Sequence, residues 1–150
     1  MPDIVDAHSL TPRENRKLLL AGQLAFLPTG VLTTLLGPML PILYARWSLS
    51  DTQAGNLFLI QFLACLVGVQ LSGPVLSRVG FRPVFLGGLL LMACGITTFY
   101  MGTLWLGMVS VAIFGLGLGF IIPTDNLLIS EVSAESRSSA LSLLNFFWGV

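Results

Sequence analysis

The sequence predicts an all-α membrane protein, and three observations lead to that prediction. Hydrophobic residues make up 55% of the 150 residues and charged residues only 9%, whereas a water-soluble domain carries about 25% charged residues. The mean hydropathy is +0.89. Four long apolar runs follow one another, and about 20 apolar residues are enough to cross a bilayer as a helix. The expected fold is the first four helices, and part of a fifth, of a larger transmembrane bundle.

The N-terminal region divides into a polar tail and a first apolar run. Residues 1–17 are polar and mixed in charge, and we expect a cytoplasmic tail there. Residues 18–45 carry no formal charge, so they form the first predicted span of a transmembrane domain covering residues 18–150. A secretory signal has an apolar region of only about 7 to 15 residues with a cleavage site soon after it, so this run is expected to stay attached.

The remaining spans follow at short intervals. They are predicted at about 54–76, 84–102, 104–130 and 138–150. Before the second span, Ser50 and Gln53 have the spacing of a capping box, which predicts a helix start there. The last run is too short to cross roughly 30 Å of hydrocarbon at about 1.5 Å per residue. We therefore expect the chain to stop inside its fifth span and to need further C-terminal helices for function.

The distribution of Lys and Arg predicts the orientation in the membrane. Basic residues precede the first span or lie in the second and fourth links, and Arg46 alone lies on the other side. Because cytoplasmic links carry the excess of basic residues, the N-terminus and those two links are expected in the cytoplasm. The predicted location is the plasma membrane, crossed several times, which is the inner membrane in a bacterium. Trp47 and Tyr100 are expected as aromatic anchors at the opposite interface.

Composition also excludes several classes of function. Seven Lys and Arg balance seven Asp and Glu, so no basic field would attract nucleic acid. His8 is the only histidine, and Cys65 and Cys94 have no partner at metal-ligand spacing. We therefore expect no enzyme site, no metal and no cofactor. The glycine run 115–119 has Phe120 where a phosphate loop needs its third glycine, which favours close helix packing instead.

Polar side chains inside the spans mark candidate cavity residues. A polar group within the membrane faces protein or a water-filled space rather than lipid. Six residues are candidates for lining a substrate cavity: Gln23, Thr33, Thr34, Asp125, Asn126 and Asn145. For the uncharged ones, close packing or a hydrogen bond between helices is the alternative role.

Asp125 is the most informative of these residues. An Asp at the centre of a membrane helix costs about 2.5–3.5 kcal/mol on the insertion scale, so a favourable interaction or a functional role must offset this free-energy cost. Three roles are open: a closing lock formed with Arg78 or Arg82, a proton carrier, or a direct contact to the solute.

Glycine and proline interrupt two of the predicted spans at corresponding places. The first span contains Gly30 through Pro41, and the fourth contains Gly115 through Pro123. In transporters built from inverted repeats, paired interruptions of this kind lie beside a substrate site near the middle of the membrane. The pattern therefore predicts a transporter.

The segment between the second and third predicted spans resembles the signature loop of the major facilitator superfamily. Residues 73–83 read GPVLSRVGFRP, against the superfamily pattern G-x-x-x-D-R-x-G-R-R/K. Ser77 and Phe81 replace the usual Asp and Arg, so Asp125 or Glu131 becomes the candidate acid for the usual charge lock. The resemblance implies a cytoplasmic gating loop formed by Gly73, Ser77, Arg78, Gly80 and Arg82.

Further stretches look like the fucose-permease-like branch of sugar and proton symporters, namely residues 37–41, 115–126 and 139–145. The resemblance implies twelve helices in two halves that rock about a central site. The implied function is secondary active transport, by alternating access, of a small polar solute such as a sugar, coupled to protons. The partners would be the solute, protons and the lipid bilayer. The alternative hypothesis is a non-transporting membrane subunit or a truncated remnant of a transporter.

Overall fold

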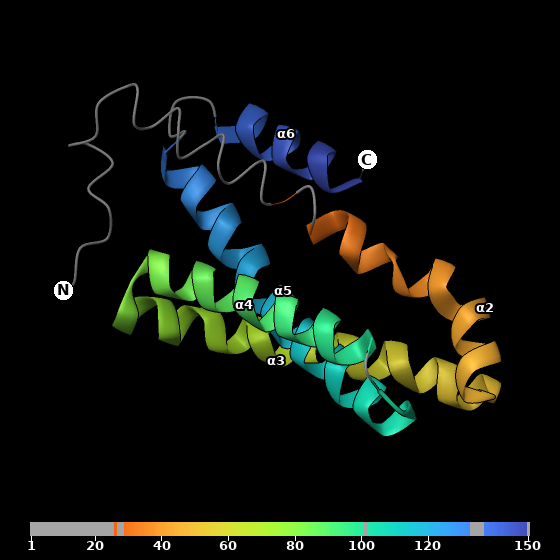
Figure 1. Cartoon of the computed structure of the whole chain (residues 1–150). Helices are drawn as coiled ribbons and strands as arrows, with labels where there is room; N and C mark the ends of the chain where they lie inside the picture. The colour runs from red at the N-terminus through yellow and green to blue at the C-terminus, as the bar shows by residue number, and fades with distance from the viewer. Residues whose placement is uncertain (1–25, 27–28, 101, 133–136, 150) are drawn as a thin grey trace.

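A computed structural model describes residues 26, 29–100, 102–132 and 137–149 of the chain (Figure 1). Residues 29–34 form helical turns. The helices that follow are α2 (Leu36–Trp47), α3 (Asp51–Val79), α4 (Phe81–Tyr100), α5 (Leu104–Val132) and α6 (Arg137–Gly149). The described residues contain no strand, which confirms the predicted all-α fold class.

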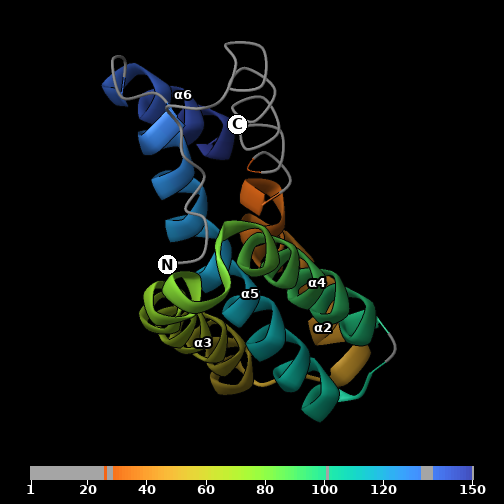
Figure 2. The same cartoon turned by 90° about the vertical axis from the view of Figure 1, so that its left-hand side faces the viewer.

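Three helices in the described part of the chain are long and apolar enough to cross a membrane. They comprise Asp51–Val79, Phe81–Tyr100 and Leu104–Ser130. α5 packs along both α3 and α4, whereas α3 and α4 meet each other far less. α6 packs beside α5, and α2 runs outside the α3–α5 bundle (Figure 2). α5 is therefore the central helix, to which the others are fitted.

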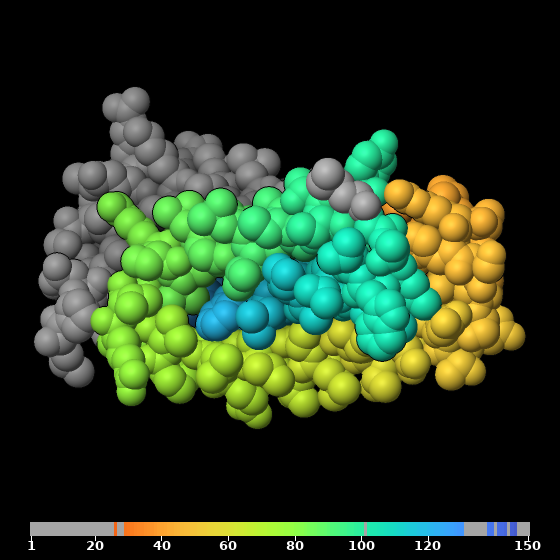
Figure 3. All heavy atoms as spheres, turned by 60° about the horizontal axis from the view of Figure 1, so that its bottom comes forward, coloured from red at the N-terminus to blue at the C-terminus, as the bar shows by residue number. Residues whose placement is uncertain are grey.

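Glycines on two sides of α5 let its neighbours approach closely. A Cβ on Gly119 would collide with the carbonyl oxygen of Cys65 in α3, and a Cβ on Gly117 would lie 2.7 Å from the carbonyl oxygen of Gly88 in α4. On the face shown in Figure 3, the blue part of α5 appears only as a patch between α3 and α4. These contacts confirm that the glycine run serves helix packing, since a side chain at these positions would force the backbones apart.

The start of α3 is the capping box that the sequence predicts. The backbone N–H of Gln53 donates to Ser50 Oγ at 3.3 Å, and the backbone N–H of Ser50 donates to Gln53 Oε1 at 2.9 Å. Just before it, Ser48 has a left-handed backbone with φ +50° and ends α2. The link between α2 and α3 is therefore short and held by its own polar groups.

The junction between α3 and α4 is tighter than the loop expected from the sequence. Gly80, with φ +82°, is the only residue between the two helices. Its N–H donates to the carbonyl oxygen of Leu76 at 3.0 Å and closes the end of α3. The predicted gating loop is thus mostly helical: Gly73, Ser77 and Arg78 lie in α3, and Arg82 lies in α4. The chain reverses within one residue because glycine tolerates a positive φ.

The first predicted span is interrupted near Leu35. Residues 29–34 are helical, Leu35 is a turn residue, and α2 begins at Leu36. Pro38 lacks an N–H, and a proline ring clashes with the carbonyl four residues earlier, which here belongs to Thr34. The Thr34 hydroxyl also donates to the Val31 carbonyl at 3.0 Å, within the turn before the break. The expected interruption of this span is present.

The expected interruption of the fourth span is absent, because α5 continues through Pro123 without a break. Side chains supply hydrogen bonds around the proline: Thr124 Oγ1 donates to the Phe120 carbonyl and Asn126 Nδ2 donates to the Ile122 carbonyl. α5 is also held between α3 and α4 over its length. Packing on two sides keeps the helix continuous where composition alone predicts a break.

Candidate functional site

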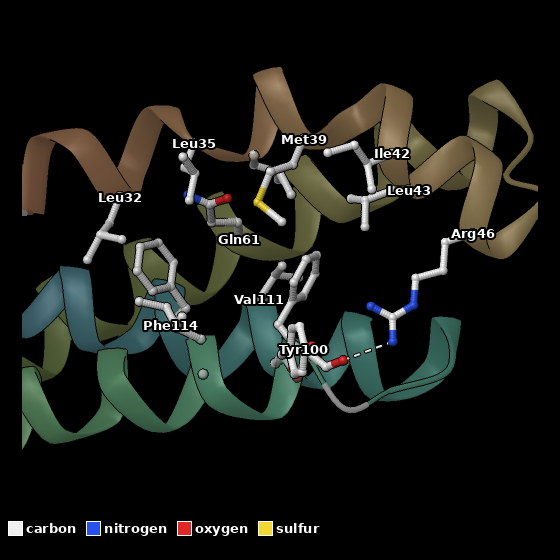
Figure 4. A pocket seen from close by; sticks show the side chains of 15 residues that line it. Leu32, Leu35, Met39, Ile42, Leu43, Arg46, Gln61, Tyr100, Val111 and Phe114 are labelled. Atoms are coloured by element: carbon white, nitrogen blue, oxygen red, sulfur yellow. Dashed lines mark hydrogen bonds between the residues drawn. The ribbon is translucent and has the colours of Figure 1, made fainter.

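A pocket of about 200 Å³ lies between α2 and the α3–α5 bundle (Figure 4). Its wall is largely apolar. α2 contributes Met39 and Leu43, α4 contributes Phe99, and α5 contributes Val111 and Phe114. A predominantly apolar lining with a few polar groups is typical of a small-molecule site.

The polar residues of the pocket come from four helices: Arg46 of α2, Gln61 of α3, Tyr100 of α4 and Ser110 of α5. The Ser110 hydroxyl lies 2.6 Å from the Leu106 carbonyl oxygen and 2.9 Å from the Thr98 hydroxyl, so its single O–H is used within the protein. Gln61 of α3 is 3% exposed, and it lines the pocket together with Met39 of α2 (Figure 4). No hydrogen bond joins the Gln61 side chain to another described residue, which leaves its amide available to a ligand.

Arg46 stands at the α4–α5 end of the pocket. Its Nη2 donates to the Tyr100 carbonyl oxygen at 2.9 Å, and its guanidinium carbon lies 5.9 Å from the centre of the Tyr100 ring. Figure 4 shows the guanidinium turned toward Tyr100, with the apolar part of the wall beside it. No acidic side chain pairs with Arg46 in the described part of the chain; the nearby Asp51 accepts a hydrogen bond from Tyr44 at 2.8 Å instead.

Trp47 holds the same end of α2 against the bundle. Its ring meets the ring of Phe99 edge to face with centroids 5.3 Å apart, and a Cβ on Gly107 would lie 2.5 Å from the indole. With the Arg46 bond to Tyr100, these contacts bring Trp47 and Tyr100 to one end of the bundle. Their role as membrane anchors stays a prediction.

Most of the predicted cavity residues bond within their own helices. Thr33 Oγ1 donates to the Thr29 carbonyl at 2.6 Å, and Asn145 Nδ2 donates to the Leu141 carbonyl at 2.9 Å. The side chains of Thr34 and Asn126 do the same. None of these four lines the pocket, and Gln23 lies outside the described residues. Their part in a substrate cavity stays a prediction.

Asp125 is the exception among the predicted residues, because its side chain is fully buried (0% exposed) and neither carboxylate oxygen has a hydrogen-bond partner among the described residues. Arg78 and Arg82 are exposed at the α3–α4 junction. The predicted lock between Asp125 and either arginine is therefore not formed in this structure. A buried carboxylate without a partner is costly. The roles of Asp125 as a proton carrier or as a direct contact to the solute stay predictions.

Two pocket residues, Arg46 and Gln61, were not among the predicted cavity residues. Each carried a signal: Arg46 is the one basic residue on the far side of the predicted topology, and Gln61 is a polar residue in the second apolar run. Neither signal shows that a pocket lies nearby. Whether Arg46 and Gln61 line the same pocket depends on how α2 lies against α3, which local sequence does not reveal.

The fold and the pocket together define a class: a multi-pass membrane protein of packed helices with a small apolar site among them. Residues 23–150 match the Major Facilitator Superfamily, and the chain belongs to that superfamily. The segment that resembles the superfamily signature, residues 73–83, spans the junction of α3 and α4.

The chain is similar to two curated proteins with transporter names. NiaP of Bacillus subtilis, provisionally named as a niacin/nicotinamide transporter, is 28% identical over 141 residues, which cover 93% of this chain and 35% of NiaP. The 4-hydroxybenzoate transporter PcaK of Pseudomonas aeruginosa is 29% identical over 150 residues, which cover 97% of this chain and 32% of PcaK. The chain thus spans about a third of the length of these relatives. No solved structure matches it.

Proposed function

We propose that the protein to which this chain belongs is a secondary transporter that moves a small solute across the plasma membrane by alternating access. The observation that carries the proposal is a pocket among the helices of a chain matching the Major Facilitator Superfamily over residues 23–150. Both relatives bear transporter names. Alternating access needs a solute site between helices that can rearrange, and the pocket lies between helices.

The pocket favours a solute with a single aromatic ring. A dry cavity of about 150 Å³ lined by Leu, Ile and Phe is able to hold benzene, and this pocket measures about 200 Å³. Its wall includes Phe99 and Phe114 and offers few hydrogen-bonding groups. The names of both relatives refer to single-ring aromatic compounds. We therefore place such a compound ahead of the sugar implied by the fucose-permease-like resemblance, because a sugar needs many hydrogen bonds.

Proton coupling through Asp125 is the second part of the proposal. A buried carboxyl without a partner is stable only when neutral or newly paired, and a group that gains and loses a proton as the helices rearrange would couple transport to a proton gradient. The burial of Asp125 and its free oxygens support this role. The positive-inside pattern supports a cytoplasmic N-terminus.

Uptake by proteoliposomes containing the full-length protein tests the proposal. We expect saturable uptake of 4-hydroxybenzoate, nicotinate or nicotinamide, increased by an inward proton gradient. A sugar panel serves as the comparison. Uptake of a sugar with no uptake of the three aromatic compounds would overturn the solute class, and no uptake of any compound would overturn transport itself.

A further inference from the structure

We propose that Arg46 is the anion-binding residue of the pocket and holds the carboxylate of a single-ring aromatic acid, with the ring against Phe99 and Phe114 and a polar ring substituent at Gln61. The inference rests on the proposed function and names how the solute would be recognised. Its basis is one cation, one free amide and an apolar wall around a single cavity.

The position of Arg46 suits anion binding. The bond from Nη2 to the Tyr100 carbonyl, 2.9 Å long, orients the guanidinium at the pocket wall. A guanidinium has five N–H donors, and this is the one hydrogen bond that Arg46 makes to the described residues. The remaining donors form a planar fork that matches both oxygens of a carboxylate.

Arg46 is an exposed side chain at this end of the pocket, and its charge has no ion-pair partner in the described part of the chain. Asp51 is the acidic residue closest in sequence, and its carboxylate accepts from the Tyr44 hydroxyl at 2.8 Å rather than from Arg46. A cation beside an apolar cavity, without an internal counter-ion, favours an anionic ligand over a neutral one of the same shape. A second cation does not line the pocket, so one carboxylate is the best match.

The wall beyond Arg46 suits the rest of such a molecule. Figure 4 shows Leu43 and the Tyr100 end of the pocket near Arg46, whereas Gln61 lies toward Phe114 and Met39. The Gln61 amide offers both a donor and an acceptor, and it is 3% exposed without a partner among the described residues. A ring hydroxyl or ring nitrogen placed there would satisfy the amide, since an unmet buried polar group is costly.

Paired acids and amides test the inference, because they share their shape and differ in charge. The probes are nicotinate against nicotinamide and benzoate against benzamide, measured by equilibrium binding to the purified full-length protein. We expect Arg46→Gln to weaken binding of both acids about tenfold or more and to change binding of both amides less than twofold. Arg46→Lys should weaken the acids less, since a lysine keeps the charge but loses the planar fork.

Trp47→Phe is the matched control. Trp47 holds the same end of α2 and does not line the pocket, so this variant loosens the attachment without removing a charge. It should leave the ratio of acid to amide affinity unchanged.

Two outcomes would overturn the role of Arg46 and leave the aromatic solute class standing. One is that Arg46→Gln weakens the binding of acids and amides equally. The other is that Trp47→Phe lowers the ratio of acid to amide affinity as much as Arg46→Gln does. A wild-type protein that binds neither acids nor amides would overturn both. If Arg46→Gln does not fold, the acid to amide ratio of Arg46→Lys decides: an unchanged ratio overturns the inference.

Discussion

The indole nitrogen of Trp47 donates a hydrogen bond of 3.0 Å to the carbonyl oxygen of Gly102, across 55 residues of sequence. The bond ties the end of α2 to the connection between α4 and α5, and it stands beside the Arg46 bond to the Tyr100 carbonyl. Two consecutive side chains at the end of α2 are therefore hydrogen-bonded to backbone oxygens at the end of α4 and in the α4–α5 connection. Movement of this end of α2 away from the bundle would break both bonds.

Replacing Trp47 by Phe should loosen this end of α2. The variant keeps an aromatic ring near Phe99 but loses the bond to Gly102, and a hydrogen bond is worth about 0.5–1.5 kcal/mol net. We expect a lower melting temperature in detergent and faster hydrogen exchange in α2. Trp105→Phe is the control, since Trp105 is 78% exposed. Equal exchange rates in the two variants would contradict the tethering role.

Replacing Gly119 by Val should disrupt the packing of α5 on α3. The new side chain would collide with the backbone at Cys65 and Gly68, and overpacking of this kind costs about 1–3 kcal/mol or more. Gly87→Ala is the control, because a Cβ on Gly87 meets nothing within 4 Å. We expect a large fall in melting temperature for the first variant and none for the second.

Replacing Gly80 by Ala should destabilise the α3–α4 junction. Gly80 has φ +82° and ψ 175°, a backbone region that is essentially limited to glycine and costs another residue about 1–3 kcal/mol. A Cβ there meets nothing within 4 Å, so conformational strain alone accounts for the effect. The melting temperature should fall, whereas Gly73→Ala, in open space within α3, should not lower it. A Gly80→Ala protein as stable as the parent would show that the junction adopts another backbone.

Replacing Asp125 by Asn should abolish accumulation driven by a proton gradient and spare exchange of solute across the membrane. The variant removes the titrating group but keeps the size of a side chain that makes no hydrogen bond in the described structure. Uptake and counterflow in proteoliposomes separate the two activities. Asp51→Asn is the comparison, because Asp51 is exposed at the start of α3. Undiminished accumulation in Asp125→Asn would retire the proton-carrier role.

Replacing Gln61 by Leu should affect solutes according to their ring substituent. Leu is similar in size but offers no hydrogen bond, so 4-hydroxybenzoate should bind about threefold to tenfold more weakly. Benzoate, which lacks the hydroxyl, should bind as well as before or better. Equilibrium binding with the two compounds measures the difference, and an equal effect on both would place the hydroxyl away from Gln61.

Several features could be predicted from sequence because their causes are local. Ser50 and Gln53 form their capping box through atoms three residues apart. The break at Leu35 follows from Pro38, which removes a donor and crowds the preceding turn. Phe120 stands where a phosphate-binding loop needs its third glycine. The resulting prediction, that the glycine run serves helix packing, is confirmed by the close contacts of these glycines. The prediction of a loop at the α3–α4 junction was wrong, because α3 continues to Val79 and α4 begins at Phe81. The signature pattern specifies which residues occur there but not whether they are helical.

By itself, the sequence determined the all-α class and the presence of helices able to cross a membrane, because length and apolar composition decide whether a helix is stable in lipid. Tertiary structure alone decided which polar residues share a pocket. Arg46 and Gln61 line the same pocket through the placement of α2 on α3–α5, and Pro123 stays within an unbroken α5 because two neighbouring helices support it. Those outcomes depend on contacts between residues distant in sequence, which no local pattern encodes.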